Sequence, residues 1–266
     1  MTVYEFSRAY LEDQTSTYLP DFLIADLAFY DKPHIFSWPP YFTSTPSSVQ
    51  KSDLMKMLAF ILQNRFNLPN TINFEENYDT LRSVTNNFDA SHIASFSPED
   101  FVDLLSRNIG FVLPSKSWSN YARGIVEAAR YLNGIDPFNY ASYLKKANSN
   151  PEALVQDLCC IHGMGPALAR NFLKEIGVVD LGKPDVHLYA VFQAFDPTVT
   201  TPEDFDRSLV DQASKAGVSP FQMDRVIWLI CSGNYFKHRI KIRKRNLRDA
   251  FVNSLKEAVE NNTVTP

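Results

Sequence analysis

The 266-residue sequence predicts an all-α fold of two helical lobes with a cleft between them. Apolar residues recur at helical spacing, most clearly over residues 54–62. Prolines such as Pro98 and Pro151 follow a polar residue, at the first helical position, where the missing N–H costs nothing. Strand patterns are few, because only short β-rich pieces near 33–43 and 239–243 could pair or remain extended. The hydrophobic content of 45% is enough for one large domain or two coupled lobes.

The same periodicity and capping patterns place the expected helices along the chain: 52–62, one opening at 97–100, 119–132, 150–160, 166–176, 186–194, 202–216, 220–229 and 246–259. We divide the chain into an N-terminal extension at 1–49 that packs on the core, a core at 50–235 in two helical lobes, and a basic segment with a helix at 236–266. The stretch 14–50 is rich in Pro, Ser, Thr and aromatic residues and should be irregular.

The cysteines and histidines argue against a metal, a cluster or a disulfide framework. There are three cysteines, Cys159, Cys160 and Cys231, and an odd count with two adjacent members does not suit a set of disulfides. An all-cysteine iron–sulfur cluster needs four thiolates. None of the five histidines forms an HxxxH or HExxH pair. We therefore expect no metal and no cofactor.

Targeting features are also missing from the sequence. No apolar run is long enough to span a bilayer, because charges or prolines interrupt each candidate. The first residues, MTVYEFSRAYLED, carry acids and lack the apolar stretch of a secretory signal. We expect a soluble intracellular protein without a membrane partner, either cytoplasmic and associated with the nucleoid or nuclear, and we expect a monomer.

Charge is distributed unevenly along the chain. The formal net charge is −4, which alone speaks weakly against a nucleic-acid partner. Residues 237–248, KHRIKIRKRNLR, hold seven Lys or Arg and no acid, and the rest of the chain has 19 basic against 30 acidic residues. Such an asymmetry often marks a contact with a polyanion. The alternative is a solvated face of a C-terminal helix or hairpin.

The most informative segment is 150–190, and its first feature is a tight turn between two helices. The turn is Ile-His-Gly-Met-Gly at 161–165, and the second helix begins at Pro166. Gly163 and Gly165 allow positive φ and leave the outer face free of side chains. The free amides of the turn and of the helix start can donate to a phosphate oxygen without sequence preference. The alternative is an ordinary αα-hairpin that happens to use glycines.

The second feature is a carboxylate at the start of the following helix. The chain passes through a Gly/Pro loop to Lys183, Pro184 and Asp185, and the next helix begins near Val186. Pro184 keeps Lys183 out of the helical conformation. Asp185 could be no more than an N-cap. An N-cap is also accessible to a ligand, so the same carboxylate is a candidate catalytic group.

These residues resemble the helix-hairpin-helix, Gly-Pro-Asp DNA glycosylases, which include endonuclease III, adenine glycosylase and the 8-oxoguanine glycosylases. The family's hairpin Leu-Pro-Gly-Val-Gly is similar to 161–165, and its Gly/Pro loop and Asp are similar to Gly182, Pro184 and Asp185. Its Val-Asp-X-His is similar to Pro-Asp-Val-His at 184–187. The resemblance covers about residues 50–235 and is strongest at 161–187.

Three departures from the family pattern shape the expected chemistry. His162 replaces the usual hairpin proline, and the cysteines that would form an iron–sulfur cluster are absent. Ala167 stands where bifunctional members carry a lysine, so no obvious amine is present for a Schiff base. The resemblance therefore implies a monofunctional enzyme without the cluster, although Lys183 could substitute as the amine.

The resemblance also assigns roles to individual residues. It implies that Asp185 stabilises an oxocarbenium-like sugar and orients the attacking water after the base has been flipped out of the duplex. The amides of Gly163 and Gly165 would hold a phosphate, as would Lys183. His187 would donate to a neighbouring phosphate, or it could be a helix-start residue bonded locally.

Gln63 and Asn64 lie at the end of the helix from Asp53, where the resemblance is looser. Family members carry Gln or Asn side chains there that fill the gap left by the flipped base. The alternative is that Gln63 and Asn64 cap their own helix.

The resemblance thus implies a base-excision DNA repair enzyme that leaves an abasic site, without naming the base. Some relatives in phage and phage-defence settings act on hypermodified pyrimidines or their nucleotides, so a phage-type modified pyrimidine is one possible substrate. The alternatives are a non-catalytic DNA-binding module, an enzyme of the same fold that acts on free modified nucleotides, and a plain helical scaffold. The basic run at 237–248 favours DNA over a nucleotide.

Overall fold

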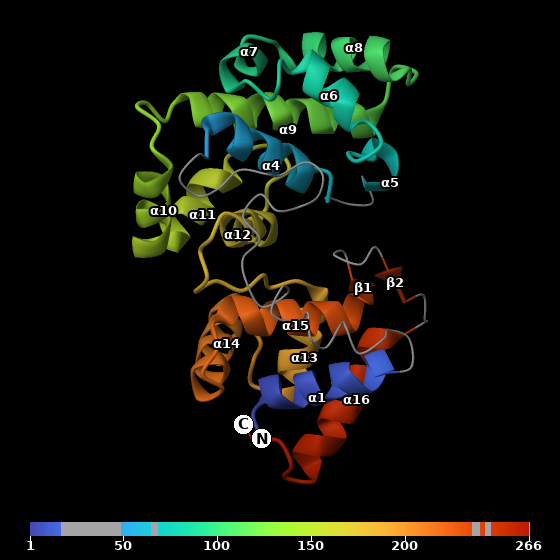
Figure 1. Cartoon of the computed structure of the whole chain (residues 1–266), viewed down its shortest axis with the longest axis vertical. Helices are drawn as coiled ribbons and strands as arrows, with labels where there is room; N and C mark the ends of the chain where they lie inside the picture. Colours follow the sequence, from blue (N-terminus) through green and yellow to red (C-terminus); the bar gives the residue numbers. More distant parts are fainter. Residues whose placement is uncertain (17–48, 65–68, 236–239, 243–245, 266) are drawn as a thin grey trace. The chain divides into compact units, whose positions relative to one another are not determined.

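The computed structural model describes residues 1–16, 49–64, 69–235, 240–242 and 246–265 (Figure 1). Helices make up most of these residues, which confirms the predicted all-α class. The chain divides into two compact units after Gly177. We call residues 49–177 the central unit, and residues 1–16 with 178–265 the terminal unit.

The central unit is built around its longest helix, α9. Its helices are α4 (Lys51–Leu62), α5 (Pro69–Ile72), α6 (Tyr78–Val84), α7 (Ala90–Ala94), α8 (Pro98–Ile109), α9 (Lys116–Asn133), α10 (Tyr140–Ser149), α11 (Pro151–Cys159) and α12 (Pro166–Glu175). Helix α9 contacts α4, α7 and α8, and α12 contacts α4 and α11. On α9, buried Tyr121 donates to the carbonyl of Ala59 on α4, so this core interface includes a satisfied polar group.

The terminal unit joins both ends of the chain around one apolar core. It contains α1 (Val3–Ser16), α13 (Val186–Phe195), α14 (Pro202–Lys215), α15 (Pro220–Ser232), β1 (Asn234–Tyr235), β2 (Ile240–Lys241) and α16 (Leu247–Glu260). The strands pair antiparallel, Asn234 with Lys241 and Tyr235 with Ile240. Leu11 of α1, Phe192 of α13 and Phe251 of α16 belong to the same buried cluster. The expected short strand near 239–243 is thus present, and the piece near 33–43 lies outside the described residues.

Several expected helix starts are confirmed by their caps, whereas the helix expected at 119–132 begins earlier, at Lys116, with Ser115 as its N-cap. Ser97 accepts a hydrogen bond from the amide of Asp100, and Asn150 accepts one from the amide of Ala153. Thr201 and Asp204 form a reciprocal capping box at the start of α14. At the start of α4 the N-cap is Gln50, with Asp53 accepting from its amide, so the helix begins one residue earlier than Ser52.

Other parts of the fold differ from the sequence-based division. Helix α1 was not expected, and it includes residues 14–16 of the stretch predicted to be irregular. The two compact units also differ from the division at 1–49, 50–235 and 236–266. Apolar side chains of α1 and α16 share a core with α13–α15, which places both chain ends in one unit.

Within the described parts of the chain, the helices are too short or too polar to cross a membrane.

Candidate active site

Asp185 occupies the N-cap of α13, where its two carboxylate oxygens have different partners. Oδ1 accepts hydrogen bonds from the amides of His187 at 2.9 Å and Leu188 at 3.2 Å. Oδ2 lies 3.5 Å from Nζ of Lys183. The Asp185 side chain is 15% exposed, so it is mostly desolvated but not sealed from a ligand. The cap fixes its orientation and leaves Oδ2 as the oxygen that can act on a substrate.

The loop before Asp185 is fixed to α15 by a buried carboxylate. Oδ2 of Asp224 accepts the amide of Lys183, and Asp224 is only 1% exposed. The amide of Asp185 donates to the carbonyl of Lys183 at 2.7 Å, which closes a three-residue turn at Pro184. Sequence reasoning did not assign Asp224 to the site, because it lies 41 residues from Lys183 and no local pattern links them.

Gly182 packs closely against α14 at the base of this loop. A Cβ atom at this position would lie 2.1 Å from Cδ2 of Leu209 and 3.4 Å from the ring of Phe205, both on α14. A larger residue would therefore require the end of the buried Leu209 side chain to move. The glycine favours the close approach of the loop that carries Lys183 and Asp185 to α14.

His187 follows Asp185 on the first turn of α13 and is partly buried. Burial lowers its pKa, and the positive charges of Arg248 and Lys183 lower it further, whereas Asp185 opposes the shift. The imidazole is therefore neutral at pH 7. Its Nδ1 is buried and has no hydrogen-bond partner among the described residues. Because Nδ1 is enclosed by protein, a ligand would meet other atoms of the ring.

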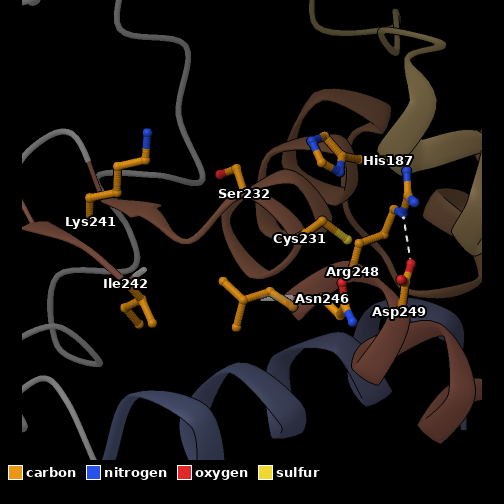
Figure 2. A pocket seen from close by; sticks show the side chains of 9 residues that line it. His187, Cys231, Ser232, Lys241, Ile242, Asn246, Arg248 and Asp249 are labelled. Carbon is orange, nitrogen blue, oxygen red and sulfur yellow. Dashed lines mark hydrogen bonds and ion pairs between the residues drawn. The ribbon is translucent and has the colours of Figure 1, made fainter. Parts of the chain in front are cut away.

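His187 also lines a pocket of about 320 Å³ in the terminal unit. Figure 2 shows Lys241 and Ile242 on one side, with His187, Arg248 and Asp249 on the other. Nε of Arg248 lies 3.2 Å from Oδ1 of Asp249. Two members, Lys241 and Arg248, belong to the basic run 237–248, but residues 237–239 and 243–245 lie outside the described residues. The basic run and His187 are thus the parts of this pocket that the sequence analysis had singled out.

Cys231 and Ser232, at the end of α15, complete the pocket wall beneath His187. Burial raises the pKa of the Cys231 thiol to about 12, with a further contribution from the nearby Asp185 carboxylate. A thiol in this state is neutral and is not a nucleophile at physiological pH. Cys231 is therefore a packing residue of the pocket.

The hairpin of the central unit has the geometry expected of an anion-binding turn. Gly163 adopts a φ of +90°, which a residue with a Cβ would adopt only with strain. Gly165 is the N-cap of α12, and a Cβ atom there would meet nothing within 4 Å. The amides of Gly163, Gly165 and Ala167 have no hydrogen-bond partner among the described residues. Three donors are thus available at the start of a ten-residue helix.

Side chains of helix α9 form hydrogen bonds with the hairpin. Oε2 of Glu127 accepts the amide of His162 at 2.6 Å, and Nε2 of His162 lies 3.2 Å from Oδ1 of Asn120. Burial raises the pKa of Glu127, but the hydrogen bonds from Arg123 and from the His162 amide outweigh it and hold the pKa below its usual value. Gly124 permits the contact, because a Cβ there would lie 2.7 Å from the carbonyl oxygen of His162. His162 stands where the family pattern has a proline, and its amide and ring form hydrogen bonds with Glu127 and Asn120 of α9.

Gln63 and Asn64 differ in their accessibility. Gln63 is 6% exposed, and its Oε1 accepts the amide of Phe74 at 3.0 Å. This position favours the structural alternative for Gln63, since a side chain held inside the unit does not project toward DNA. Asn64 is exposed and follows the C-cap of α4. Of the two wedge candidates, Asn64 is the one with an accessible side chain.

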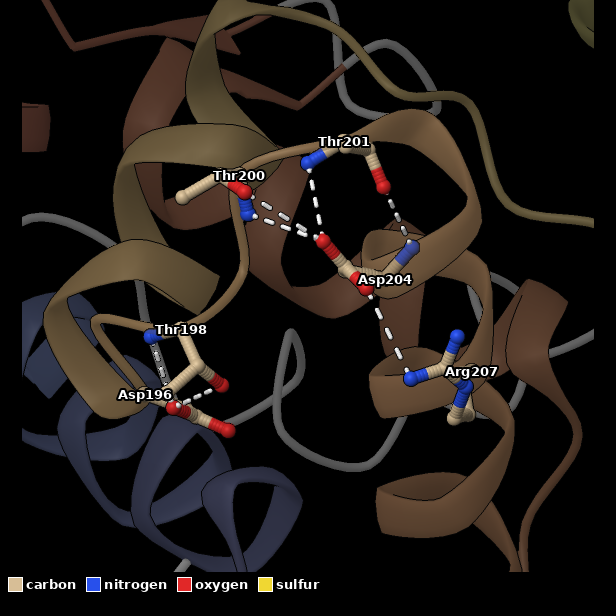
Figure 3. Close-up of polar contacts among 6 residues, drawn as sticks. All are labelled: Asp196, Thr198, Thr200, Thr201, Asp204 and Arg207. Atoms are coloured by element: carbon tan, nitrogen blue, oxygen red, sulfur yellow. Dashed lines mark hydrogen bonds and ion pairs between the residues drawn. The ribbon is translucent and has the colours of Figure 1, made fainter.

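Two other carboxylates of the terminal unit have purely local partners (Figure 3). Oδ1 of Asp196, at the opposite end of α13 from Asp185, accepts the amide and hydroxyl of Thr198 at 2.9 and 2.7 Å. Asp204 accepts from Thr200 and Thr201 and lies near Arg207. Among the described residues, no group of three or more His, Cys, Asp or Glu side chains could hold a metal ion.

The structure thus brings Lys183, Asp185 and His187 together in the terminal unit, and it places the hairpin glycines with Gln63 and Asn64 in the central unit. Protein-family models, curated proteins and solved structures all gave no match to this chain.

Proposed function

We propose that this protein is a DNA glycosylase of the helix-hairpin-helix, Gly-Pro-Asp type that excises a damaged or modified base. The observation that carries the proposal is the carboxylate of Asp185, with Oδ1 fixed by two helix-start amides and Oδ2 next to the ammonium of Lys183. A fixed and partly desolvated carboxylate is the group that such a reaction needs beside the sugar. The predicted cleft between the lobes stays a prediction.

The reaction is hydrolysis of the N-glycosidic bond. The bond from C1′ to the base breaks, and its electron pair leaves with the base, which takes a proton from solvent. Oδ2 of Asp185 stabilises the positive sugar, accepts a proton from the water whose oxygen bonds to C1′, and then releases that proton to solvent, so one water is divided between sugar and base. The amides of His187 and Leu188 keep the carboxylate oriented during this step.

We propose that Lys183 controls whether Oδ2 of Asp185 is accessible to the substrate. Its ammonium lies 3.5 Å from Oδ2 of Asp185. A phosphate of bound DNA competes for the same ammonium, and its departure leaves Oδ2 open to the sugar. We further propose that the enzyme is monofunctional, because Ala167 stands where bifunctional members carry the lysine that forms a Schiff base.

The hairpin of the central unit supports the choice of DNA as partner. Its three amides, which have no partner in the described part of the chain, and the dipole of α12 suit a phosphate group, which carries no sequence information. Support by Glu127 and Asn120 fixes these donors before binding, so little conformational entropy is lost. The hairpin would hold the DNA backbone without selecting a base.

The experiment compares wild type with Asp185→Asn and Asp196→Asn on duplexes that carry a panel of damaged and modified bases. The panel includes hydroxymethylated and glucosylated pyrimidines, and alkali cleavage reveals abasic sites. The Asn oxygen can still cap α13, so Asp185→Asn should fold but lose at least about a hundredfold in rate. Asp196→Asn changes a cap at the other end of the same helix and should excise as wild type does.

Base release by Asp185→Asn at the wild-type rate would exclude Asp185 as the catalytic carboxylate. Salt-sensitive binding by both proteins with no release from any duplex would instead favour the non-catalytic DNA-binding module.

A further inference from the structure

Asp224 of α15 is a buried carboxylate next to the loop that carries Asp185, and only 1% of the residue is exposed. A carboxylate is unfavourable in such a position unless hydrogen bonds or opposite charges compensate for the lost water. One compensating bond is the one that Oδ2 of Asp224 accepts from the amide of Lys183. A hydrogen bond to an ionised acceptor is roughly twice as strong as one between neutral groups, so this bond holds the Lys183 peptide firmly.

A continuous chain of hydrogen bonds connects Asp224 to the carboxylate of Asp185. Asp224 accepts the amide of Lys183, and the carbonyl of Lys183 accepts the amide of Asp185 at 2.7 Å. Oδ1 of Asp185 in turn accepts the amides of His187 and Leu188 at 2.9 and 3.2 Å. Lys183 is thus held at its N–H and at its carbonyl, which restricts the turn that presents Asp185.

The earlier part of the loop is attached to the unit without Asp224. The carbonyl of Val179 accepts an amide from the first turn of α15 at 3.0 Å, and Leu181 is buried. Gly182 packs against α14. These contacts all precede Lys183 in the sequence, so they do not depend on Asp224. Loss of the Asp224 carboxylate would therefore free the last peptide before the turn rather than detach the loop.

The geometry that this peptide controls is the one between Lys183 and Asp185. The amides at the start of α13 orient the Asp185 carboxylate relative to that helix only. The place of the Lys183 ammonium, 3.5 Å from Oδ2 of Asp185, depends on the backbone of Lys183 as well. A displacement of about 1 Å in a reacting group can cost about a hundredfold in rate, so a small shift here would matter.

We propose that Asp224 is a positioning residue of the excision reaction, which acts through the Lys183 peptide to hold Lys183 and Asp185 in their working arrangement. This role rests on the proposed function, because it takes Asp185 as the catalytic carboxylate. The role requires a hydrogen-bond acceptor at residue 224. An asparagine oxygen can accept the same amide, whereas an apolar side chain cannot.

The test compares wild type with Asp224→Ala, Asp224→Asn and Asp224→Leu, each at a temperature at which circular dichroism shows it to be folded. Leucine fills the space without supplying an acceptor, so D224L keeps the test valid if D224A fails to fold. The control for lowered stability is Leu255→Ala, which removes a fully buried side chain of α16 in the same unit. Single-turnover excision and duplex affinity are measured on the base that wild type releases.

We expect D224A and D224L to lose at least about tenfold in single-turnover rate while duplex affinity stays within about twofold, because the arrangement at the sugar changes and the DNA contacts do not. D224N should stay within about threefold of wild type, since its oxygen still accepts the amide. L255A should excise as wild type does. A loss of stability alone would not separate rate from affinity in this way.

Amide hydrogen exchange provides a second readout that needs no substrate. In D224A and D224L the amides of Lys183 and Asp185 should exchange faster relative to those of α15, because the first loses its acceptor and the second depends on the same turn. D224N and L255A should keep the wild-type ratio.

Three outcomes would overturn the inference. These are wild-type rates in D224A and D224L, a rate in D224N as low as in D224A, and an equal loss of rate in L255A. If wild type releases no base from any duplex, the proposed function fails, and hydrogen exchange alone decides whether Asp224 positions the turn. An unchanged exchange ratio in D224A and D224L would then reject that role as well.

Discussion

Nζ of Lys183 lies 3.5 Å from Oδ2 of Asp185, and the two side chains are 20% and 15% exposed. The chain places them together with a three-residue turn at Pro184, and Asp224 fixes that turn from α15. The proposed catalytic carboxylate therefore has a counter-ion two residues before it in the sequence. This ion pair is partly buried, so salt screens it less than an exposed pair.

The first prediction concerns the role of Lys183. Lys183→Gln should weaken DNA binding and reduce the slope of log affinity against log salt by about one, because one phosphate contact is lost. Lys183→Arg should keep most of the affinity, since a guanidinium also binds phosphate. Fluorescence anisotropy at several salt concentrations measures both effects.

The same pair of variants tests the monofunctional mechanism. Borohydride should trap no covalent complex between DNA and wild type, and K183R should excise within about tenfold of wild type. A trapped complex that forms with wild type and disappears in K183R would identify Lys183 as a Schiff-base nucleophile. The protein would then also be a lyase.

The second prediction uses the open outer face of Gly165. Gly165→Ala adds a Cβ where the structure has nothing within 4 Å, at a φ of −86°, so the free energy of unfolding should be unchanged. A phosphate bound to the hairpin amides would meet this methyl group, and DNA affinity should fall about tenfold. Gly134→Ala, also an exposed helix-end position of the central unit, should change neither quantity. Wild-type affinity in G165A would remove the hairpin from the DNA-binding surface.

The features that the sequence predicted are those set by neighbouring residues. The caps at Ser97, Asn150 and Thr201 follow from a polar residue before proline, and the hairpin glycines follow from the turn that they permit. Asp185 was expected at a helix start for the same reason. These interactions join residues that are two to four positions apart, so the local sequence is enough to predict them.

The features that the sequence did not predict depend on distant parts of the chain. Asp224 meets Lys183 across 41 residues, and the pocket combines the start of α13 with the end of α15 and the start of α16. Gln63 was a wedge candidate on local grounds, but its burial depends on the amide of Phe74, 11 residues away. Tertiary packing determines such contacts, and residue type alone does not encode them.

The third prediction separates Gln63 from Asn64. Gln63→Ala should lower the free energy of unfolding by about 1–3 kcal/mol, because the buried amide of Phe74 loses its acceptor. Asn64→Ala should leave stability unchanged, because the side chain is exposed. If Asn64 fills the gap left by a flipped base, N64A should excise more slowly from duplex than wild type, with less effect on single-stranded DNA. Equal rates on both substrates would exclude the wedge.

The fourth prediction concerns the cysteines. Burial raises the pKa of Cys231 to about 12, and burial also raises the pKa of Cys159, whereas Cys160 is exposed. Iodoacetamide at pH 8 should therefore label Cys160 first and should label Cys231 only in urea. Mass spectrometry of digested protein measures each site, and Cys160→Ser should remove the fast reaction. Rapid labelling of Cys231 in the native protein would contradict its burial beside the pocket.

The last prediction is a pH dependence of stability that arises from His187. Burial lowers its pKa in the folded protein below the ordinary value of about 6.5, and Arg248 and Lys183 add to this shift. Above that value the ring is neutral in both the folded and unfolded states and contributes nothing to the pH dependence. As pH falls below 6.5, the unfolded chain binds a proton that the folded protein does not, so the free energy of unfolding falls until the folded pKa is reached.

Urea unfolding of wild type and His187→Asn between pH 5 and 8 measures the difference in the free energy of unfolding between the two proteins. The stability of wild type relative to H187N should decrease as pH is lowered through this window. A relative stability that rises at low pH would mean that His187 is protonated in the folded protein, and the neutral ring inferred from its burial would be wrong.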